Sequence, residues 1–152
     1  MRNKILVVVS LVMVLSLGFA VAAEAAELEG SGRLWAKGAG YAELHGDGVV
    51  DIVGHGVGTV VVKGAEVLRA QGSGRRWDLP NDTVVFGGWR GHIHIEGDDL
   101  LVRMRGGIIE FAAEGTGWVL LKGRGYYRVN GQGGRWTLDG VRIDLPPKAE
   151  SE

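Results

Sequence analysis

The chain of 152 residues has no cysteine and only three prolines. Without cysteine it has neither a disulfide framework nor a thiolate that could attack a substrate or bind a metal. Positive and negative charges almost balance, with a formal net charge of −1, so the sequence lacks the basic field that drives phosphate binding. Nucleic acid is therefore not an expected partner.

What the chain has in excess is glycine, with 27 residues. A strict Gly-X-Y period is absent, which together with the few prolines excludes collagen. The hydrophobic fraction of 45% excludes a disordered low-complexity chain, because such chains have too little apolar surface to offset the entropy cost of ordering. The glycines must then serve a folded domain.

The first 23 residues have the three parts of a secretory signal peptide. A basic start with Arg2 and Lys4 precedes an uncharged apolar run, and small residues that suit signal peptidase follow it. We expect residues 1–23 to be removed and the protein to be exported to the periplasm, the cell surface or the extracellular space. The alternative is an uncleaved N-terminal anchor, since the apolar run can just span a bilayer, and only this alternative makes the membrane a partner. At the other end, residues 146–152 are expected to form a disordered tail.

The glycines are concentrated in Gly-x-Gly doublets spaced eight residues apart. The doublets begin at residues 30, 38, 46, 54, 115, 123 and 131. Between them apolar and mixed side chains alternate, which is typical of a strand with one buried face. The residues expected to point inward are Leu34, Ala36, Ala42, Leu44, Val50, Ile52, Val119, Leu121, Tyr127 and Val129. Each doublet is expected to form a tight turn, because glycine adopts positive φ without a steric penalty.

A longer repeat overlies the doublets. Residues 30–79 align with residues 89–138 without a gap, and 14 of the 50 positions are identical, eight of them glycine. This similarity predicts two duplicated halves within one all-β domain that spans residues 28–145. Trp77 and Trp136 correspond in the two halves and are expected to be packing residues.

Short alternating segments joined by turns predict an antiparallel, many-stranded barrel or sandwich. An inward glycine in each strand would allow strong curvature, and closure would remove exposed edge strands. The alternative is a β-solenoid, in which each eight-residue unit forms one side of a coil and each glycine doublet forms a corner. If the sheet is open, its unpaired strand edges predict a homo-oligomer.

Three residues of one predicted strand, His92, His94 and Glu96, share a face, because alternate side chains of a strand point the same way. Two imidazoles and a carboxylate at this spacing could bind zinc or another divalent metal, and apart from this possible metal no cofactor is expected. The apolar residues between them are expected to point inward, which puts the three on the outer face. The alternative is a solvated strand face without a ligand. His45 and His55 are further candidate ligands, but nothing in the sequence places them nearby.

Four aromatic residues, Trp35, Tyr41, Trp118 and Tyr126, occupy outward positions of the alternating pattern. Trp35 and Tyr41 are expected on successive strands, as are Trp118 and Tyr126, so that each pair could form a flat platform. Such platforms could stack on sugar rings or on a protein, which makes carbohydrate or an envelope protein the expected partner. The alternative is that a second sheet or the linker covers these side chains and makes them part of the core.

The sequence offers little for hydrolytic chemistry. The serines after the leader are Ser31, Ser73 and Ser151, of which the first two lie inside glycine doublets and neither follows a strand-to-helix elbow. We therefore expect an exported, non-catalytic β-domain of the cell envelope or surface with a structural, assembly or ligand-binding role. Two alternatives stay open. One is a divalent-metal-binding protein or metal-dependent enzyme centred on the His-x-His-x-Glu strand, and the other is a carbohydrate-binding module that uses exposed Trp and Tyr.

Overall fold

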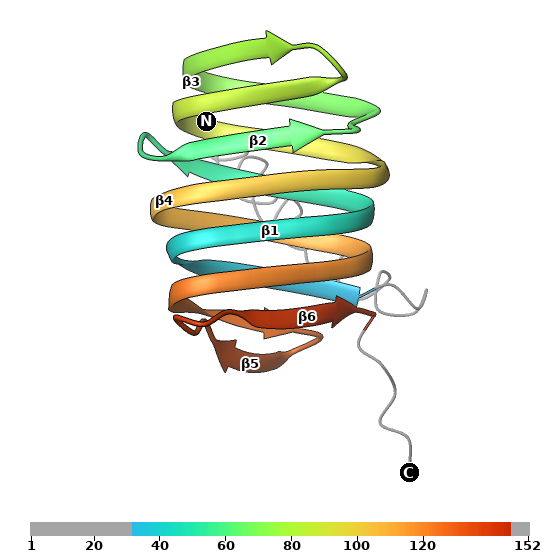
Figure 1. Ribbon diagram of the computed structural model, residues 1–152, viewed down its shortest axis with the longest axis vertical. Coiled ribbons are helices and arrows are strands. Elements are labelled where there is room, and N and C mark those ends of the chain that lie inside the picture. Colours follow the sequence, from blue (N-terminus) through green and yellow to red (C-terminus); the bar gives the residue numbers. More distant parts are fainter. Residues whose placement is uncertain (1–31, 147–152) are drawn as a thin grey trace, which may run out of the picture. The chain divides into compact units, whose positions relative to one another are not determined.

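The computed structural model describes residues 32–146, which form strands and connecting turns without a helix in that range. The strands, drawn in Figure 1, are β1 (Gly32–His55), β2 (Thr59–Lys63), β3 (Val67–Leu79), β4 (Thr83–Val129), β5 (Gln132–Arg135) and β6 (Val141–Leu145). The predicted signal peptide and residues 147–152 of the predicted tail lie outside the described residues. Between residues 32 and 146 no helix is present that could cross a membrane. The prediction of an all-β domain is confirmed.

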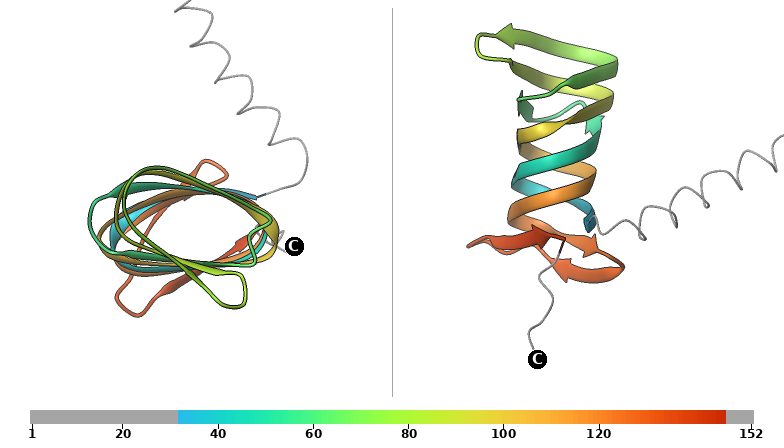
Figure 2. Two further views of the ribbon diagram at one scale, coloured as in Figure 1. Left: turned by 90° about the horizontal axis from the view of Figure 1, so that it is seen from above. Right: turned by 90° about the vertical axis from the view of Figure 1, so that its right-hand side faces the viewer.

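Two long strands, β1 and β4, wind side by side around a common axis (Figures 1 and 2). β1 is antiparallel to β4 along both of its edges, because Leu34 lies opposite Ala113 on one edge and opposite Val129 on the other. Two successive passes of β4 therefore lie on either side of Leu34. They are sixteen residues apart, so sixteen residues of β4 complete one circuit of the coil. Residues eight positions apart therefore lie on opposite sides, and the coil seen from above is an oval (Figure 2).

Two rows of outward side chains define the two broad sides of this oval. The row on the first side, in order across β1 and β4, is Trp35, Ala112, Asp51 and His94. The row on the second side, in order across β4, β1, β4 and β2, is Leu120, Glu43, Arg103 and Val61. These two broad sides are called the first side and the second side.

The glycine doublets that begin at residues 38 and 46 lie within β1 and do not interrupt it. Gly46 is opposite Gly117 on the neighbouring strand, and both have positive φ values, of 147° and 137°. A Cβ atom on Gly46 would lie 1.9 Å from the carbonyl oxygen of Thr116. The backbones thus approach where the coil bends, which requires glycine on both strands. The tight turns predicted at these doublets are replaced by bends, because each strand keeps its ladder partners through them.

The core fills the inside of the coil. Of the side chains predicted to point inward, eight are buried, namely Leu34, Ala36, Ala42, Leu44, Val50, Ile52, Val119 and Leu121. Tyr127 and Val129 are partly buried against the same cluster. The predicted alternation is therefore correct for the residues that hold the two long strands together. The inward positions of the two long strands are therefore occupied by the core.

The antiparallel sheet is not closed. β2 lies between two passes of β4, with Val61 opposite both Val85 and Arg103. β3 pairs with β4 along one edge and forms one end of the sheet, while β5 and β6 pair with β4 at the other end. Among the described strands, the outer edge of β3 has no partner. The two ends of the sheet do not meet, in contrast to the closed barrel that an inward glycine in each strand suggested.

Candidate functional site

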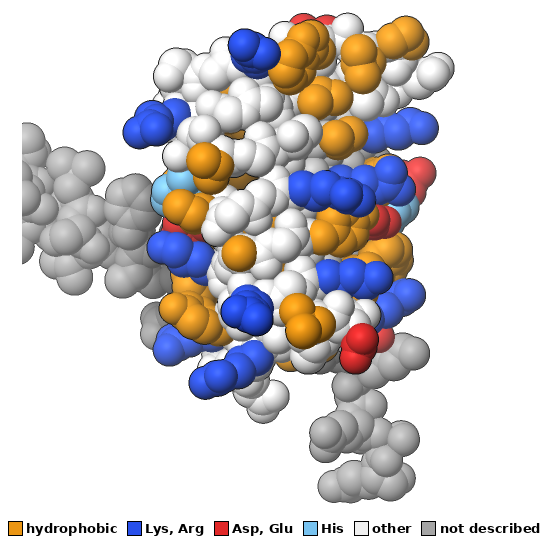
Figure 3. Space-filling view, turned by 60° about the vertical axis from the view of Figure 1, so that its left-hand side comes forward, with side chains coloured by type: hydrophobic (Ala, Val, Ile, Leu, Met, Phe, Trp, Pro, Cys, Tyr) orange, Lys and Arg blue, Asp and Glu red, His pale blue; other side chains and the backbone are white. Residues whose placement is uncertain are grey.

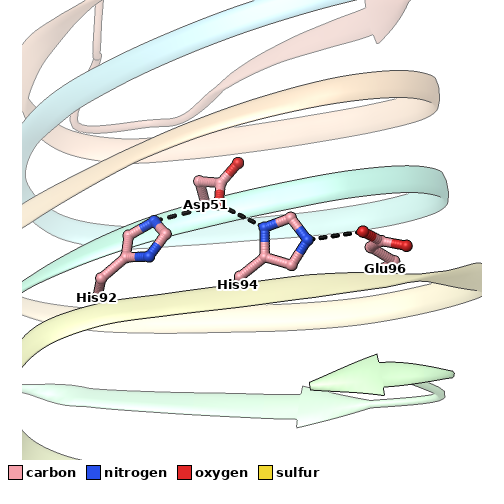
Figure 4. Close-up of polar contacts among 4 residues, drawn as sticks. All are labelled: Asp51, His92, His94 and Glu96. Atoms are coloured by element: carbon pink, nitrogen blue, oxygen red, sulfur yellow. Dashed lines mark hydrogen bonds and ion pairs between the residues drawn. The ribbon is translucent and has the colours of Figure 1, made fainter. Parts of the chain in front are cut away.

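The predicted metal ligands lie together on the first side, joined by a carboxylate from a neighbouring strand (Figure 4). His92, His94 and Glu96 come from β4, and Asp51 comes from β1, directly opposite His94. Asp51 Oδ1 lies 2.7 Å from His94 Nδ1 and 3.1 Å from His92 Nε2. Glu96 Oε1 lies 2.7 Å from His94 Nε2. The four side chains form a chain of alternating carboxylates and imidazoles.

This geometry suits a protonated His94. A carboxylate accepts hydrogen bonds, so both ring nitrogens of His94 must carry a hydrogen to donate to Asp51 and Glu96 at once. The hydrogen bonds to Glu96 and Asp51 raise the pKa of His94 above its ordinary value, against a smaller opposing effect of burial. The arrangement therefore holds a positive charge between two negative charges on an outer surface of the sheet.

A metal ion would need a different arrangement of the same residues. Metal ligands must present a bare lone pair, and both nitrogens of His94 are turned toward carboxylates. Among residues 32–146, no group of three or more His, Asp or Glu side chains is placed to hold one metal ion. The divalent-metal site at His92, His94 and Glu96 stays a prediction, and the contacts favour proton binding at this position.

We expect the stability of the protein to decrease as the pH rises through the pKa of His94. Because that pKa is raised on folding, the stabilisation is complete below the unfolded pKa of about 6.5 and is lost above the folded one. Since His94 is partly solvated, the effect on the free energy of unfolding should be about 1 kcal/mol or less. Urea unfolding between pH 5.5 and 9, with a chelator present, measures it, and His94→Gln should flatten this part of the profile.

An NMR titration provides a second readout of the same prediction. The His94 ring should titrate above its ordinary value in the parent protein, and Asp51→Asn should lower the midpoint by removing one hydrogen-bonded carboxylate. A midpoint at or below the ordinary value, unchanged in the variant, would contradict the assigned network.

The other two histidines join different partners. His55 Nε2 lies 2.8 Å from Glu110 Oε2. His45 stacks on Trp118, with ring centroids 4.7 Å apart, and its Nε2 lies 3.5 Å from Glu43 Oε1. Neither is joined to the Asp51 network in the described contacts. No Ser or Thr hydroxyl is hydrogen-bonded to an imidazole in residues 32–146, so these histidines do not form a nucleophile–base pair there.

The predicted aromatic residues divide between the two sides. Trp35 and Tyr126 lie together on the first side, with ring centroids 6.5 Å apart and planes inclined by 31°. Their pairing follows from the register, because Lys37, two residues after Trp35, lies opposite Tyr126. The two rings line a hollow, and Tyr126 is 61% exposed. The residues around this hollow are Trp35, Tyr126, Tyr127, Arg128, Gly133, Gly134 and Arg135.

Tyr41 and Trp118 lie on the second side. The Tyr41 hydroxyl donates to Glu43, and the Arg105 guanidinium lies over the Tyr41 ring, 5.0 Å from its centroid. Trp118 is stacked on one face by His45, and the Arg142 guanidinium lies 4.7 Å from its centroid. Both rings are thus engaged by neighbouring side chains. The platforms expected from Trp35 with Tyr41 and from Trp118 with Tyr126 are replaced by one contact between Trp35 and Tyr126.

Two features of the surface were not expected from the sequence. Asp51 completes the histidine network, although the sequence showed only that it occupies an outward position of an alternating segment. Arg103 and Arg105 line a hollow on the second side. Either could be found in advance only with the register of β1 against β4, because the partners are distant in the sequence.

No protein-family model, curated protein or solved structure matches this chain.

Proposed function

We propose that this protein is an exported, non-catalytic binding domain whose hollow around Trp35 and Tyr126 takes a carbohydrate. The observation that carries the proposal is the aromatic pair itself, which is accessible and lies beside polar donors. Flat aromatic rings bury the apolar faces of a ligand, while a few polar groups at the rim fix its orientation.

The arginines of this hollow support the choice of ligand. Arg128 and Arg135 line it, and neither takes part in an ion pair among the described residues. Their guanidinium groups can therefore donate to hydroxyl, ring or carboxylate oxygens of a sugar. Gly133 and Gly134 of β5 also line the hollow, and the Tyr127 ring packs against Gly134.

Export and self-association belong to the same proposal. The basic and apolar leader supports export. The duplication of residues 30–79 and 89–138, with its eight-residue glycine unit, is likewise proposed from the sequence.

The unpartnered outer edge of β3 supports association of copies through strand edges. Size-exclusion chromatography with light scattering would reveal a homo-oligomer, and a single monomeric mass at all concentrations would contradict it.

Calorimetric titration of soluble polysaccharides tests the binding function. A panel with a neutral glucan, a xylan and a uronic-acid polymer should include at least one that binds the parent protein. Trp35→Ala and Tyr126→Ala should each weaken that binding at least about tenfold, because an exposed aromatic anchor accounts for much of the energy of such a contact.

The matched control is Trp77→Ala, which removes an exposed tryptophan that does not line this hollow. It should leave the affinity unchanged. If no member of the panel binds, or if Trp35→Ala binds as tightly as Trp77→Ala, carbohydrate binding at this hollow is wrong.

A further inference from the structure

A second hollow lies on the second side, where three strands meet. It is lined by Tyr41 of β1, Thr59 and Val61 of β2, and Arg103 and Arg105 of β4. The register places Thr59 directly opposite Arg105, and Tyr41 opposite Arg105 on the next strand. Arg105 is therefore at the centre of the group, with a hydroxyl-bearing side chain on each flank.

Arg105 is fixed in position but has no carboxylate partner. Its guanidinium lies over the Tyr41 ring, 5.0 Å from the centroid, which restrains the group without using its N–H donors. None of the ion pairs between residues 32 and 146 includes Arg105. Lys122, which lies opposite Tyr41 on its other edge, is also absent from those ion pairs. The hollow thus has an uncompensated positive charge.

The carboxylate of Glu43, which lies opposite Arg103, is already engaged. Glu43 accepts from the Tyr41 hydroxyl and from Arg103 Nε, the latter at 3.3 Å, and its side chain is 15% exposed. Burial opposes its ionisation, but the Tyr41 hydrogen bond and the Arg103 charge together hold its pKa below the ordinary value. Glu43 therefore stays ionised, neutralises Arg103 and leaves Arg105 available.

We propose that this hollow binds an oxyanion, the carboxylate, sulfate or phosphate group of a ligand, with Arg105 as the principal donor. A guanidinium presents parallel N–H groups whose spacing matches two oxygens of such a group. The Thr59 hydroxyl supplies a further donor on one flank, and Val61 forms an apolar wall. Figure 3 shows one face of the molecule, on which Lys and Arg side chains stand among hydrophobic and uncharged ones.

The test is an NMR titration of the full-length protein with three separate salts, sodium acetate, sodium sulfate and sodium phosphate, against sodium chloride at equal ionic strength. The amide signals of Thr59 and Val61 report on the hollow. We expect saturable shifts with at least one of the three, and the salt that saturates identifies the group. Arg105→Gln should raise the apparent Kd at least about tenfold, because it removes a charged donor pair.

Two further variants make the test specific. Arg124→Gln removes an exposed arginine of β4 that does not line the hollow, and it should bind like the parent protein. Arg105→Lys keeps the charge without the planar fork and should bind more weakly than the parent. Shifts that fail to saturate with all three salts, or equal responses of Arg105→Gln and Arg124→Gln, would overturn the proposal. Because Trp35 lies on the other side, this result is independent of carbohydrate binding.

Discussion

Replacing Gly46 by alanine is expected to lower the free energy of unfolding by about 3 kcal/mol or more. Two costs add at this position. The φ angle of 147° is one that residues with a Cβ rarely adopt, and the new Cβ would lie 1.9 Å from the carbonyl oxygen of Thr116. That oxygen belongs to the backbone of a paired strand, so the overlap can be relieved only by moving the bend itself. Urea unfolding followed by circular dichroism measures the loss.

Gly107→Ala is the matched control. Gly107 lies in β4, the strand that pairs with β1, but its φ is not positive and a Cβ there would meet nothing within 4 Å. Alanine at this position should leave the stability within about 0.5 kcal/mol or raise it slightly, because it restricts the unfolded chain. Equal effects of the two substitutions would show that the close approach of the strands at Gly46 is absent.

Trp136→Ala is expected to cost about 3–5 kcal/mol, the range for removing a large buried aromatic side chain. Trp136 is 5% exposed, belongs to the core cluster and donates from Nε1 to the carbonyl oxygen of Tyr126 at 3.2 Å. Its ring also lies 3.0 Å from the position that a Cβ on Gly38 would occupy, so it fills the end of the coil closely. Truncation would leave a cavity and remove one hydrogen bond. Thermal or urea unfolding provides the measurement.

Trp77→Ala provides the comparison, since Trp77 corresponds to Trp136 in the sequence repeat. Trp77 is 45% exposed, so its loss should cost no more than about 1 kcal/mol. The packing role predicted from the sequence is thus correct for Trp136 and wrong for Trp77. The difference arises because Trp77 lies on β3, whose residues from 71 to 79 are all exposed. A loss at Trp77 as large as that at Trp136 would contradict this arrangement.

The local structure could be predicted because it depends on neighbouring residues. Alternation of apolar and mixed side chains identified the strands, and it correctly placed residues such as Leu34 and Ile52 inside. The path of the chain could not be predicted in the same way. A glycine doublet permits a tight turn or a bend, and only pairing of Gly46 with Gly117 on a distant strand decides in favour of the bend.

In the candidate sites, too, contacts between residues close in the sequence could be predicted and contacts between distant strands could not. His92, His94 and Glu96 could be grouped from the sequence, because they alternate on one strand. Asp51, which bridges the two imidazoles, comes from a strand about forty residues earlier, and its contact depends on the register. Likewise Trp35 faces Tyr126 and not Tyr41, because Tyr41, six residues further along β1, lies on the second side.

In this coil sixteen residues complete one circuit, so that one residue of β1 lies opposite two passes of β4. Nuclear Overhauser effects between protons of the paired segments test this arrangement. Leu34 should show cross-strand contacts to both Ala113 and Val129, and the Trp35 ring should show contacts to the Tyr126 ring and none to the Tyr41 ring. Contacts from Leu34 to only one of the two passes, or contacts between Trp35 and Tyr41, would contradict the coil and both binding sites assigned to it.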